Sequence, residues 1–291
     1  MIQHVFEIVA PLFLIVTVGY FYGARVRPEM ASANRLIMDV FMPALIFHVM
    51  IQKDFSLGQY VPLLIGGALV MLGSGVIAFL LARLCGFAWR SFVPPAMFSN
   101  WANLGLPLYV LTLGEAALGG GVMLVVAGNI LCFTIGTYIY SGKLTGLQVL
   151  RTPIIVAVVL GVVIGSLDLT VPTFIDLPLE MLGQVAIPLM LFSLGVRLTR
   201  VSFNDSTLGI IMGIFCPLVG VALALLLVQF LPLSPLHQQT LIIFGALPPA
   251  VINFMLAEQY NNDPEKVASM VIIGNIMSLI FIPLVLFFML S

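Results

Sequence analysis

The chain has 291 residues, of which 61% are hydrophobic and 8% are charged, and its formal net charge is −1. Its mean hydropathy is +1.19. A soluble domain is roughly 45–50% apolar and about 25% charged, so this composition excludes a water-soluble fold. The nearly neutral charge argues against a nucleic-acid partner. Cys85, Cys132 and Cys216 form no Cys-x-x-Cys pair, so we expect no disulfide framework, no metal site and no cofactor.

Ten apolar runs follow one another along the chain, and a helix needs about 20 apolar residues to cross a bilayer. They occupy residues 4–23, 32–51, 60–82, 92–113, 117–140, 148–167, 177–197, 207–231, 237–258 and 266–290. The first run lacks the basic flank and cleavage site of a signal peptide, so we expect it to be retained. The sequence therefore predicts an all-α integral membrane protein with ten transmembrane helices in contact with the lipid bilayer.

The basic residues are distributed unevenly over the predicted loops. The loops on one side hold Arg25, Arg27, Arg35, Arg83, Arg90, Lys143, Arg151, Arg197, Arg200 and Lys266, and the other side holds only Lys53. Because short loops rich in Lys and Arg stay in the cytoplasm, the first side is predicted to be cytoplasmic. With ten spans, both termini then lie outside a cytoplasmic (inner) membrane.

Two sequence segments recur at nearly the same spacing. Residues 39–47 (DVFMPALIF) match residues 184–192 (QVAIPLMLF), and residues 125–130 (VVAGNI) match residues 271–276 (VIIGNI). The spans therefore divide into two five-helix repeats, residues 1–140 and 147–291. Because each repeat has an odd number of spans, the two repeats have opposite orientations, as in many secondary transporters.

The fourth and ninth spans are interrupted at equivalent places. The fourth reads FSNWANLGLP over residues 98–107, and the ninth reads FGALPPAVIN over residues 244–253. Proline breaks or kinks a helix, and the freed backbone groups are tolerated only against protein or water. Ordinary proline kinks are the alternative, but they require neither the neighbouring asparagines nor the recurrence. Two broken helices in corresponding positions indicate a substrate site.

The residues at these breaks suit an anionic ligand. Each half-helix that begins at a break directs backbone N–H groups and a positive dipole end towards the bilayer midplane. Asn100, Asn103 and Asn253 add neutral amide donors. No Lys or Arg lies at the predicted midplane, which favours a monoanion or a protonated diacid. Trp101 either lines the cavity or packs beside it.

Three further residues are candidates for support or coupling. Asn129 and Asn275 belong to the repeated Gly-Asn pairs of the fifth and tenth spans, and they either support the crossing or form interhelical hydrogen bonds. Asp39 is the deepest carboxylate, so it is a candidate proton or cation carrier. The favoured interpretation is instead a structural ion pair with Arg35, one helical turn away.

The sequence resembles the auxin efflux carrier family, which includes bacterial organic-acid permeases and plant carriers. The resemblance is carried by Asn100 with LGLP at residues 104–107, by FMPALIF at residues 41–47, and above all by ALPPAVINFMLAEQYN at residues 246–261. It extends over the whole chain.

The resemblance implies ten helices in two inverted repeats. Spans one, two, six and seven form a scaffold, and spans three to five and eight to ten form a moving transport domain. Substrate binds where spans four and nine cross, and transport follows an elevator mechanism. Asn100 then contacts the substrate, and Pro107, Pro248 and Pro249 are the crossover prolines. A homodimer through the scaffold is also implied.

The chain differs from the plant carriers in two respects. It has no long loop between the halves, and its third span lacks their acid and lysine pair. We therefore expect a secondary transporter of a small organic anion, a monocarboxylate or dicarboxylate that is malate-like or malonate-like in preference to auxin-like, with a proton or sodium as the possible coupling ion. The alternative is a sensor or channel on the same scaffold. Nothing resembles zinc-protease or serine-hydrolase motifs, so an enzyme is not expected.

Overall fold

The computed structural model describes residues 2–52, 57–143, 152–167, 169–199 and 206–290. These residues are almost entirely helical, and their only strand-like pairing is a single bridge. The α-helices are α1 Ile2–Val26, α2 Ala31–Leu36, α3 Met42–Met50, α4 Leu57–Cys85, α5 Trp89–Met97, α6 Leu106–Leu113, α7 Leu118–Leu131, α8 Thr137–Ser141, α9 Pro153–Ser166, α10 Thr173–Leu198, α11 Ser206–Leu227, α12 Pro235–Ala246, α13 Ile252–Gln259 and α14 Pro264–Leu290. Short irregular helices join some of them: η1 Ile37–Phe41, η2 Trp101–Gly105, η3 Glu115–Ala117 and η4 Cys132–Gly136.

The prediction of an all-helical membrane protein is confirmed for this part of the chain. Six helical segments are long and apolar enough to cross a bilayer: Ala31–Met50, Leu57–Cys85, Glu115–Ser141, Thr173–Leu198, Ser206–Leu227 and Pro264–Leu290. The other predicted spans fall on α1, on α9 and on the two interrupted helices. The start of the sixth predicted span, residues 148–151, lies outside the described residues.

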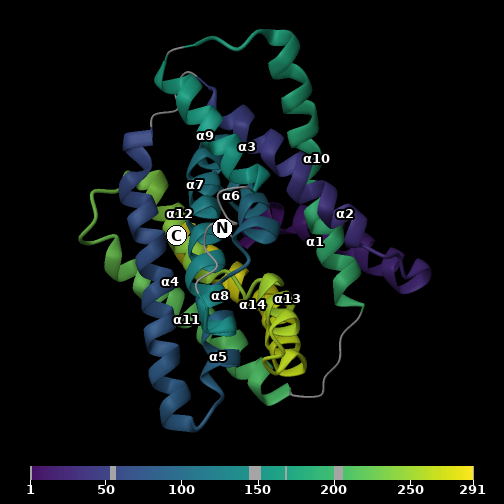
Figure 1. Ribbon diagram of the computed structural model, residues 1–291, viewed down its shortest axis with the longest axis vertical. Helices are drawn as coiled ribbons and strands as arrows, with labels where there is room; N and C mark the ends of the chain where they lie inside the picture. Colours follow the sequence, from purple (N-terminus) through teal and green to yellow (C-terminus); the bar gives the residue numbers. More distant parts are fainter. Residues whose placement is uncertain (1, 53–56, 144–151, 168, 200–205, 291) are drawn as a thin grey trace.

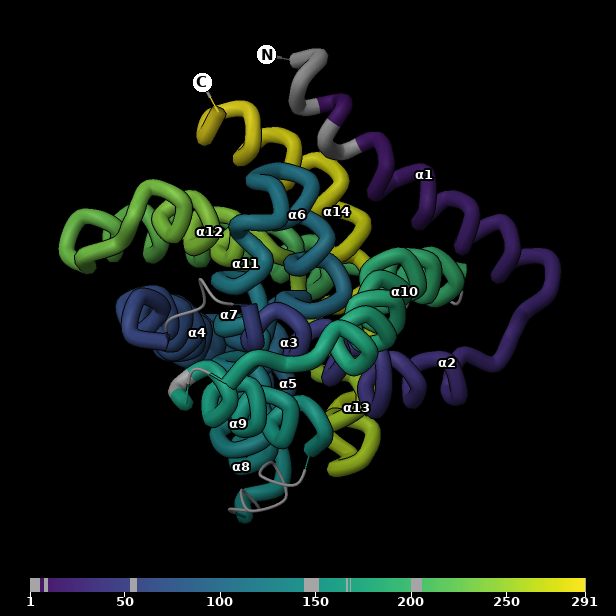
Figure 2. Tube along the Cα trace, turned by 90° about the horizontal axis from the view of Figure 1, so that it is seen from above, coloured from purple at the N-terminus to yellow at the C-terminus, as the bar shows by residue number. Residues whose placement is uncertain are grey.

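The helices pack as two groups (Figures 1 and 2). In the first group α1 runs along α10, and α3 lies against α9 and α10. In the second group α11 packs along α14 and α12, and α4 packs along α5 and α7. Glycine permits the closest approaches, because a Cβ atom on Gly195 of α10 would overlap the carbonyl oxygen of Val16 in α1.

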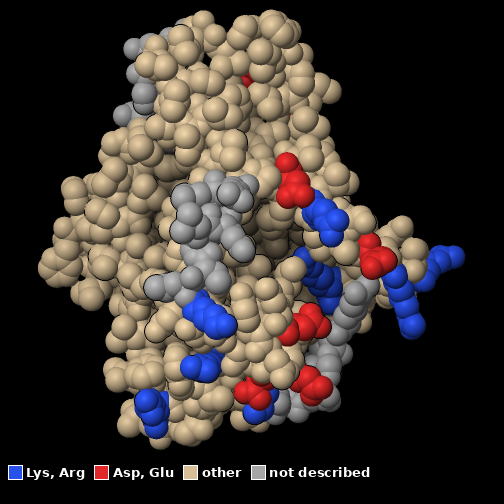
Figure 3. Space-filling view, in the orientation of Figure 1, with Lys and Arg blue, Asp and Glu red and all other residues tan. Residues whose placement is uncertain are grey.

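The outer surface of the bundle is apolar, as a bilayer requires. Large hydrophobic side chains such as Leu84, Phe174 and Phe230 are mostly exposed. Figure 3 shows that Lys and Arg on the visible face gather over the lower half of the molecule. We call this the basic end; it carries the loop between α4 and α5 and the loop between α13 and α14.

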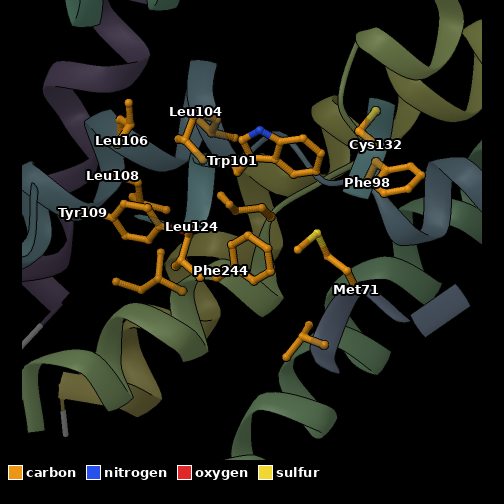
Figure 4. Packing of buried hydrophobic residues seen from close by; sticks show 14 of the residues in the cluster. Met71, Phe98, Trp101, Leu104, Leu106, Leu108, Tyr109, Leu124, Cys132 and Phe244 are labelled. Carbon is orange, nitrogen blue, oxygen red and sulfur yellow. The ribbon is translucent and has the colours of Figure 1, made fainter. Parts of the chain in front are cut away.

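The core of the second group contains aromatic side chains from the interrupted fourth span. Phe98, Trp101 and Tyr109 are buried with Phe244 of α12 (Figure 4). The rings of Phe98 and Trp101 lie edge to face, with their centroids 6.1 Å apart. Trp101 also contacts the backbone position of Gly128 in α7 so closely that no side chain fits there. Of the two interpretations of Trp101, the structure therefore supports packing.

Candidate functional site

The two interrupted helices break where the sequence predicts. α5 ends at Met97, and η2 begins at Trp101 after a short extended segment. α12 ends at Ala246, and α13 begins at Ile252. Each break therefore leaves several backbone N–H and C=O groups without an intrahelical partner.

The two breaks hydrogen-bond to each other. Ser99 and Pro249 form an antiparallel bridge. The backbone N–H of Asn100 donates to the carbonyl oxygen of Pro248 at 2.7 Å, and the N–H of Ala250 donates to the carbonyl oxygen of Phe98 at 2.9 Å. These bonds satisfy groups that could not be left facing lipid, and they fix the crossing of the two chains.

Three asparagine amides surround this crossing. Asn253 is fully buried, and its Nδ2 donates to the carbonyl oxygens of Phe98 at 2.8 Å and of Ala250 at 2.9 Å. Asn275 of α14 is 6% exposed, and its Nδ2 donates to the carbonyl oxygen of Pro249 at 2.9 Å. Asn100 is 2% exposed and donates from Nδ2 to Oδ1 of Asn275 at 3.2 Å. The amides thus link the fourth, ninth and tenth predicted spans.

A small cavity opens beside these amides. It has a volume of about 30 Å³, and Asn275 and Ser278 of α14 line it together with leucines of α1 and α10. The cavity therefore lies between the two helix groups and is only large enough for about one water molecule. Oδ1 of Asn253 is buried and has no hydrogen-bond partner in the described part of the chain. The crossing is thus closed, with one amide acceptor unused.

Not all the predicted site residues meet at the crossing. Asn103 and Asn129 are half-buried, and no side-chain hydrogen bond joins either to the described residues. Pro107 lies in the first turn of α6, beyond the crossing. Asn100, Pro248, Pro249, Asn253 and Asn275 are brought together by the bonds above.

The interpretation of Asp39 as an ion-pair partner of Arg35 is wrong. Both side chains are exposed, and the ion pairs among the described residues do not include them. Asp39 lies in η1, a π-helical segment, whereas Arg35 lies in the preceding α-helical turn. The wider turn of a π-helix changes the face on which a residue four positions later lies.

Since Asp39 has no partner in the described part of the chain, we expect Asp39→Asn to change the free energy of unfolding by less than about 0.5 kcal/mol. Thermal unfolding in detergent measures this change. A loss of several degrees in the midpoint temperature would show that Asp39 has a stabilising contact after all.

Two groups at the crossing are not predicted from the sequence, the backbone carbonyl of Phe98 and the side chain of Ser278. The carbonyl oxygen of Phe98 accepts two hydrogen bonds, but backbone acceptors leave no residue signature. Ser278 donates from Oγ to the carbonyl oxygen of Asn275 at 2.6 Å. Its position three residues after Asn275 was a readable signal, because serine commonly bonds to a carbonyl in the preceding turn.

A helical membrane protein with two interrupted helices crossing at buried amides has the architecture of a transporter. The sequence profile of the membrane transport protein family matches residues 4–147 and 141–286. The chain belongs to this family, the auxin efflux carrier family. The resemblance found in the sequence is therefore confirmed, and the family is one of transport proteins and not of enzymes.

The similar proteins are full-length matches at low identity. An uncharacterized transporter of Methanocaldococcus jannaschii is 26% identical, with 96% of each chain covered. The uncharacterized transporter YfdV of Escherichia coli is 25% identical, with 86% of this chain and 87% of YfdV covered. A Rhizobium meliloti protein named "Putative malonate transporter" is 23% identical, with 93% of this chain and 91% of that protein covered.

Proposed function

We propose that this protein is a secondary carrier of a small organic anion across a cytoplasmic membrane, with its substrate bound at the crossing of the two interrupted helices. The observation that carries the proposal is the cluster of buried amides from Asn100, Asn253 and Asn275 around two hydrogen-bonded helix breaks. Amide and backbone N–H groups at helix N-termini bind carboxylates without a buried cation.

The proposed substrate is a small carboxylate, malonate-like or malate-like. One relative has malonate in its name, at 23% identity. No described Lys or Arg takes part in the crossing bonds, so a monoanion or a singly protonated diacid suits the site better than a dianion. Because the cavity at the crossing holds only about one water molecule, the proposed substrate enters when the two helix groups move apart.

The proposed movement is an elevator. The first helix group corresponds to the expected scaffold of spans one, two, six and seven, and the second corresponds to the expected transport domain. Asn275 of the second helix group lies at the boundary with α1 and α10 of the first group. In the proposed movement one group slides against the other along this boundary, which opens the crossing first to one side of the membrane and then to the other. In this proposal the two inverted repeats are residues 1–140 and 147–291, both termini are outside, and the scaffold also forms a homodimer.

Transport by purified protein in proteoliposomes tests the proposal. We expect uptake of at least one radiolabelled carboxylate from a panel that includes malonate and malate, with saturation and a turnover far below that of a pore. Charge movement recorded in parallel identifies an electrogenic cycle. Pore-like flux would instead favour the channel alternative. Absence of both uptake and current for every carboxylate would overturn the carrier proposal and favour a sensor.

A further inference from the structure

A second, larger cavity lies at the end of the molecule opposite the basic end. Its volume is about 500 Å³. His48 of α3 and Asp176 and Glu180 of α10 line one side, and Tyr60 of α4 and Glu115 of η3 line the other. The cavity therefore separates the two helix groups at the predicted outer face, and its size is that of a small-molecule site.

A histidine–carboxylate pair lies in the wall of this cavity. Nδ1 of His48 and Oδ1 of Asp176 are 2.6 Å apart, and the side chains are 20% and 33% exposed. The pair joins α3 to α10 within the first helix group. The other ion pair in the described part of the chain joins Lys266 to Asp263 at the basic end. It is longer, at 3.4 Å, and more exposed, and its two residues are only three positions apart.

The charges around this cavity are unfavourable for an anion. None of the described residues that line it is Lys or Arg, whereas Glu115, Asp176 and Glu180 are carboxylates. His48 is the lining side chain that becomes a cation when it takes up a proton. Protonation of His48 reduces the charge of these four residues from three negative charges to two. Lys53 lies outside the described residues.

The elements packed around His48 add few other titratable groups. α10 contributes Asp176 and Glu180, and η1 contributes Asp39. α9 and α7 contain no titratable residue. Among the described residues on the far side of the cavity, the titratable ones are Glu115 and Tyr60. Tyr60 in turn lies on the ring of His237, with the ring centroids 5.1 Å apart. No group of three or more His, Cys, Asp or Glu residues in the described chain is arranged to hold a metal ion.

The corresponding position in the second half cannot respond to pH. With the offset of 145 that relates residues 39–47 to 184–192, His48 corresponds to Ser193. Ser193 also joins α10 to the first half, since its Oγ donates to Oδ1 of Asn34 at 2.8 Å. A serine–asparagine bond does not titrate. The contact of Ser193 with Asn34 therefore lacks an ionisable side chain, whereas the contact of His48 with Asp176 contains two.

We propose that His48, held in place by Asp176, is a proton-binding positioning residue of the outer cavity. Its protonation lowers the barrier to anion entry and makes transport faster at acidic pH. The inference rests on the proposed carrier function and identifies the proton, not sodium, as the ion to which transport responds.

Counterflow of radiolabelled malonate into proteoliposomes tests this inference. The pH is equal on both sides, so no proton gradient drives the exchange and protein orientation has no influence. We expect the initial rate of the wild type to rise about fivefold between about pH 8 and pH 6, the range in which histidine titrates. In His48→Gln the pH dependence should be lost apart from any part due to malonate ionisation, which is the same for every variant. His237→Gln is the matched control and should keep the wild-type rise.

Other outcomes decide against the inference. A full rise in His48→Gln, or a flat profile in the wild type, overturns it and leaves the carrier function standing. A rise that is lost in Asp39→Asn but kept in His48→Gln would assign the proton to Asp39. If His48→Gln does not fold, Asp176→Asn decides, because it removes the carboxylate that lies 2.6 Å from Nδ1 of His48, and a pH profile equal to that of the wild type overturns the inference. Absence of any counterflow by the wild type, with malonate or the other carboxylates, overturns the carrier function and this inference together.

Discussion

Asn100→Ala is expected to lower carboxylate transport by at least about tenfold, because a hydrogen bond to a charged group contributes roughly 1.5–3 kcal/mol. Asn100 is 2% exposed and supplies the amide that joins the fourth predicted span to Asn275. The protein should still fold, since the backbone bond from Asn100 to Pro248 does not depend on the side chain. The substitution leaves the buried Oδ1 of Asn275 without its donor, which costs about 1–3 kcal/mol.

Asn262→Ala provides the matched control. Like Asn100, Asn262 donates from Nδ2 to other parts of the chain, here to the carbonyl oxygens of Tyr140 at 2.8 Å and Tyr260 at 3.2 Å, but it lies in the loop between α13 and α14. Its removal should leave the apparent affinity for malonate unchanged. Uptake into proteoliposomes measures both variants. Wild-type transport by a folded Asn100→Ala protein would remove this residue from the substrate site.

Gly220→Leu is expected to prevent the second helix group from assembling. Gly220 of α11 faces Gly245 of α12 at backbone contact, and a Cβ atom at either position would overlap the carbonyl oxygen of the other. The obstruction is backbone and not the end of a flexible side chain, so α11 and α12 must separate. We expect a loss of at least about 3 kcal/mol, the upper part of the range for overpacked sites.

The substitution should also disturb the crossing of the two interrupted helices, because α12 ends one residue after Gly245, at the break in the ninth span. Displacement of α12 would therefore misalign the backbone bonds of the crossing. Gly58→Leu in α4 is the matched control, since a Cβ atom there meets nothing within 4 Å in the described part of the chain. Monodispersity and thermal unfolding in detergent compare the two variants. A Gly220→Leu protein as stable as Gly58→Leu would contradict the close packing of α11 and α12.

The helical membrane class and the two helix breaks follow from the amino-acid sequence alone. Apolar runs about 20 residues long have few alternatives to helices in a bilayer, because every backbone group must be satisfied there. Pro248 and Pro249 cannot continue the hydrogen-bonding of α12, so the break in the ninth span is a local property. The family resemblance also rested on local segments, residues 246–261 above all.

Which groups meet at the breaks depends on how the helices pack. Asn100 and Asn275 are 175 positions apart, and the bond between them depends on how α14 packs against the crossing. The role of the Phe98 carbonyl and the separation of Asp39 from Arg35 likewise follow from backbone geometry that residue types do not encode. His48 and Asp176 meet because α3 packs against α10, so this pair could not be predicted from the sequence either. Side-chain partners across a helical bundle depend on rotation and register, and apolar sequence patterns constrain both only weakly.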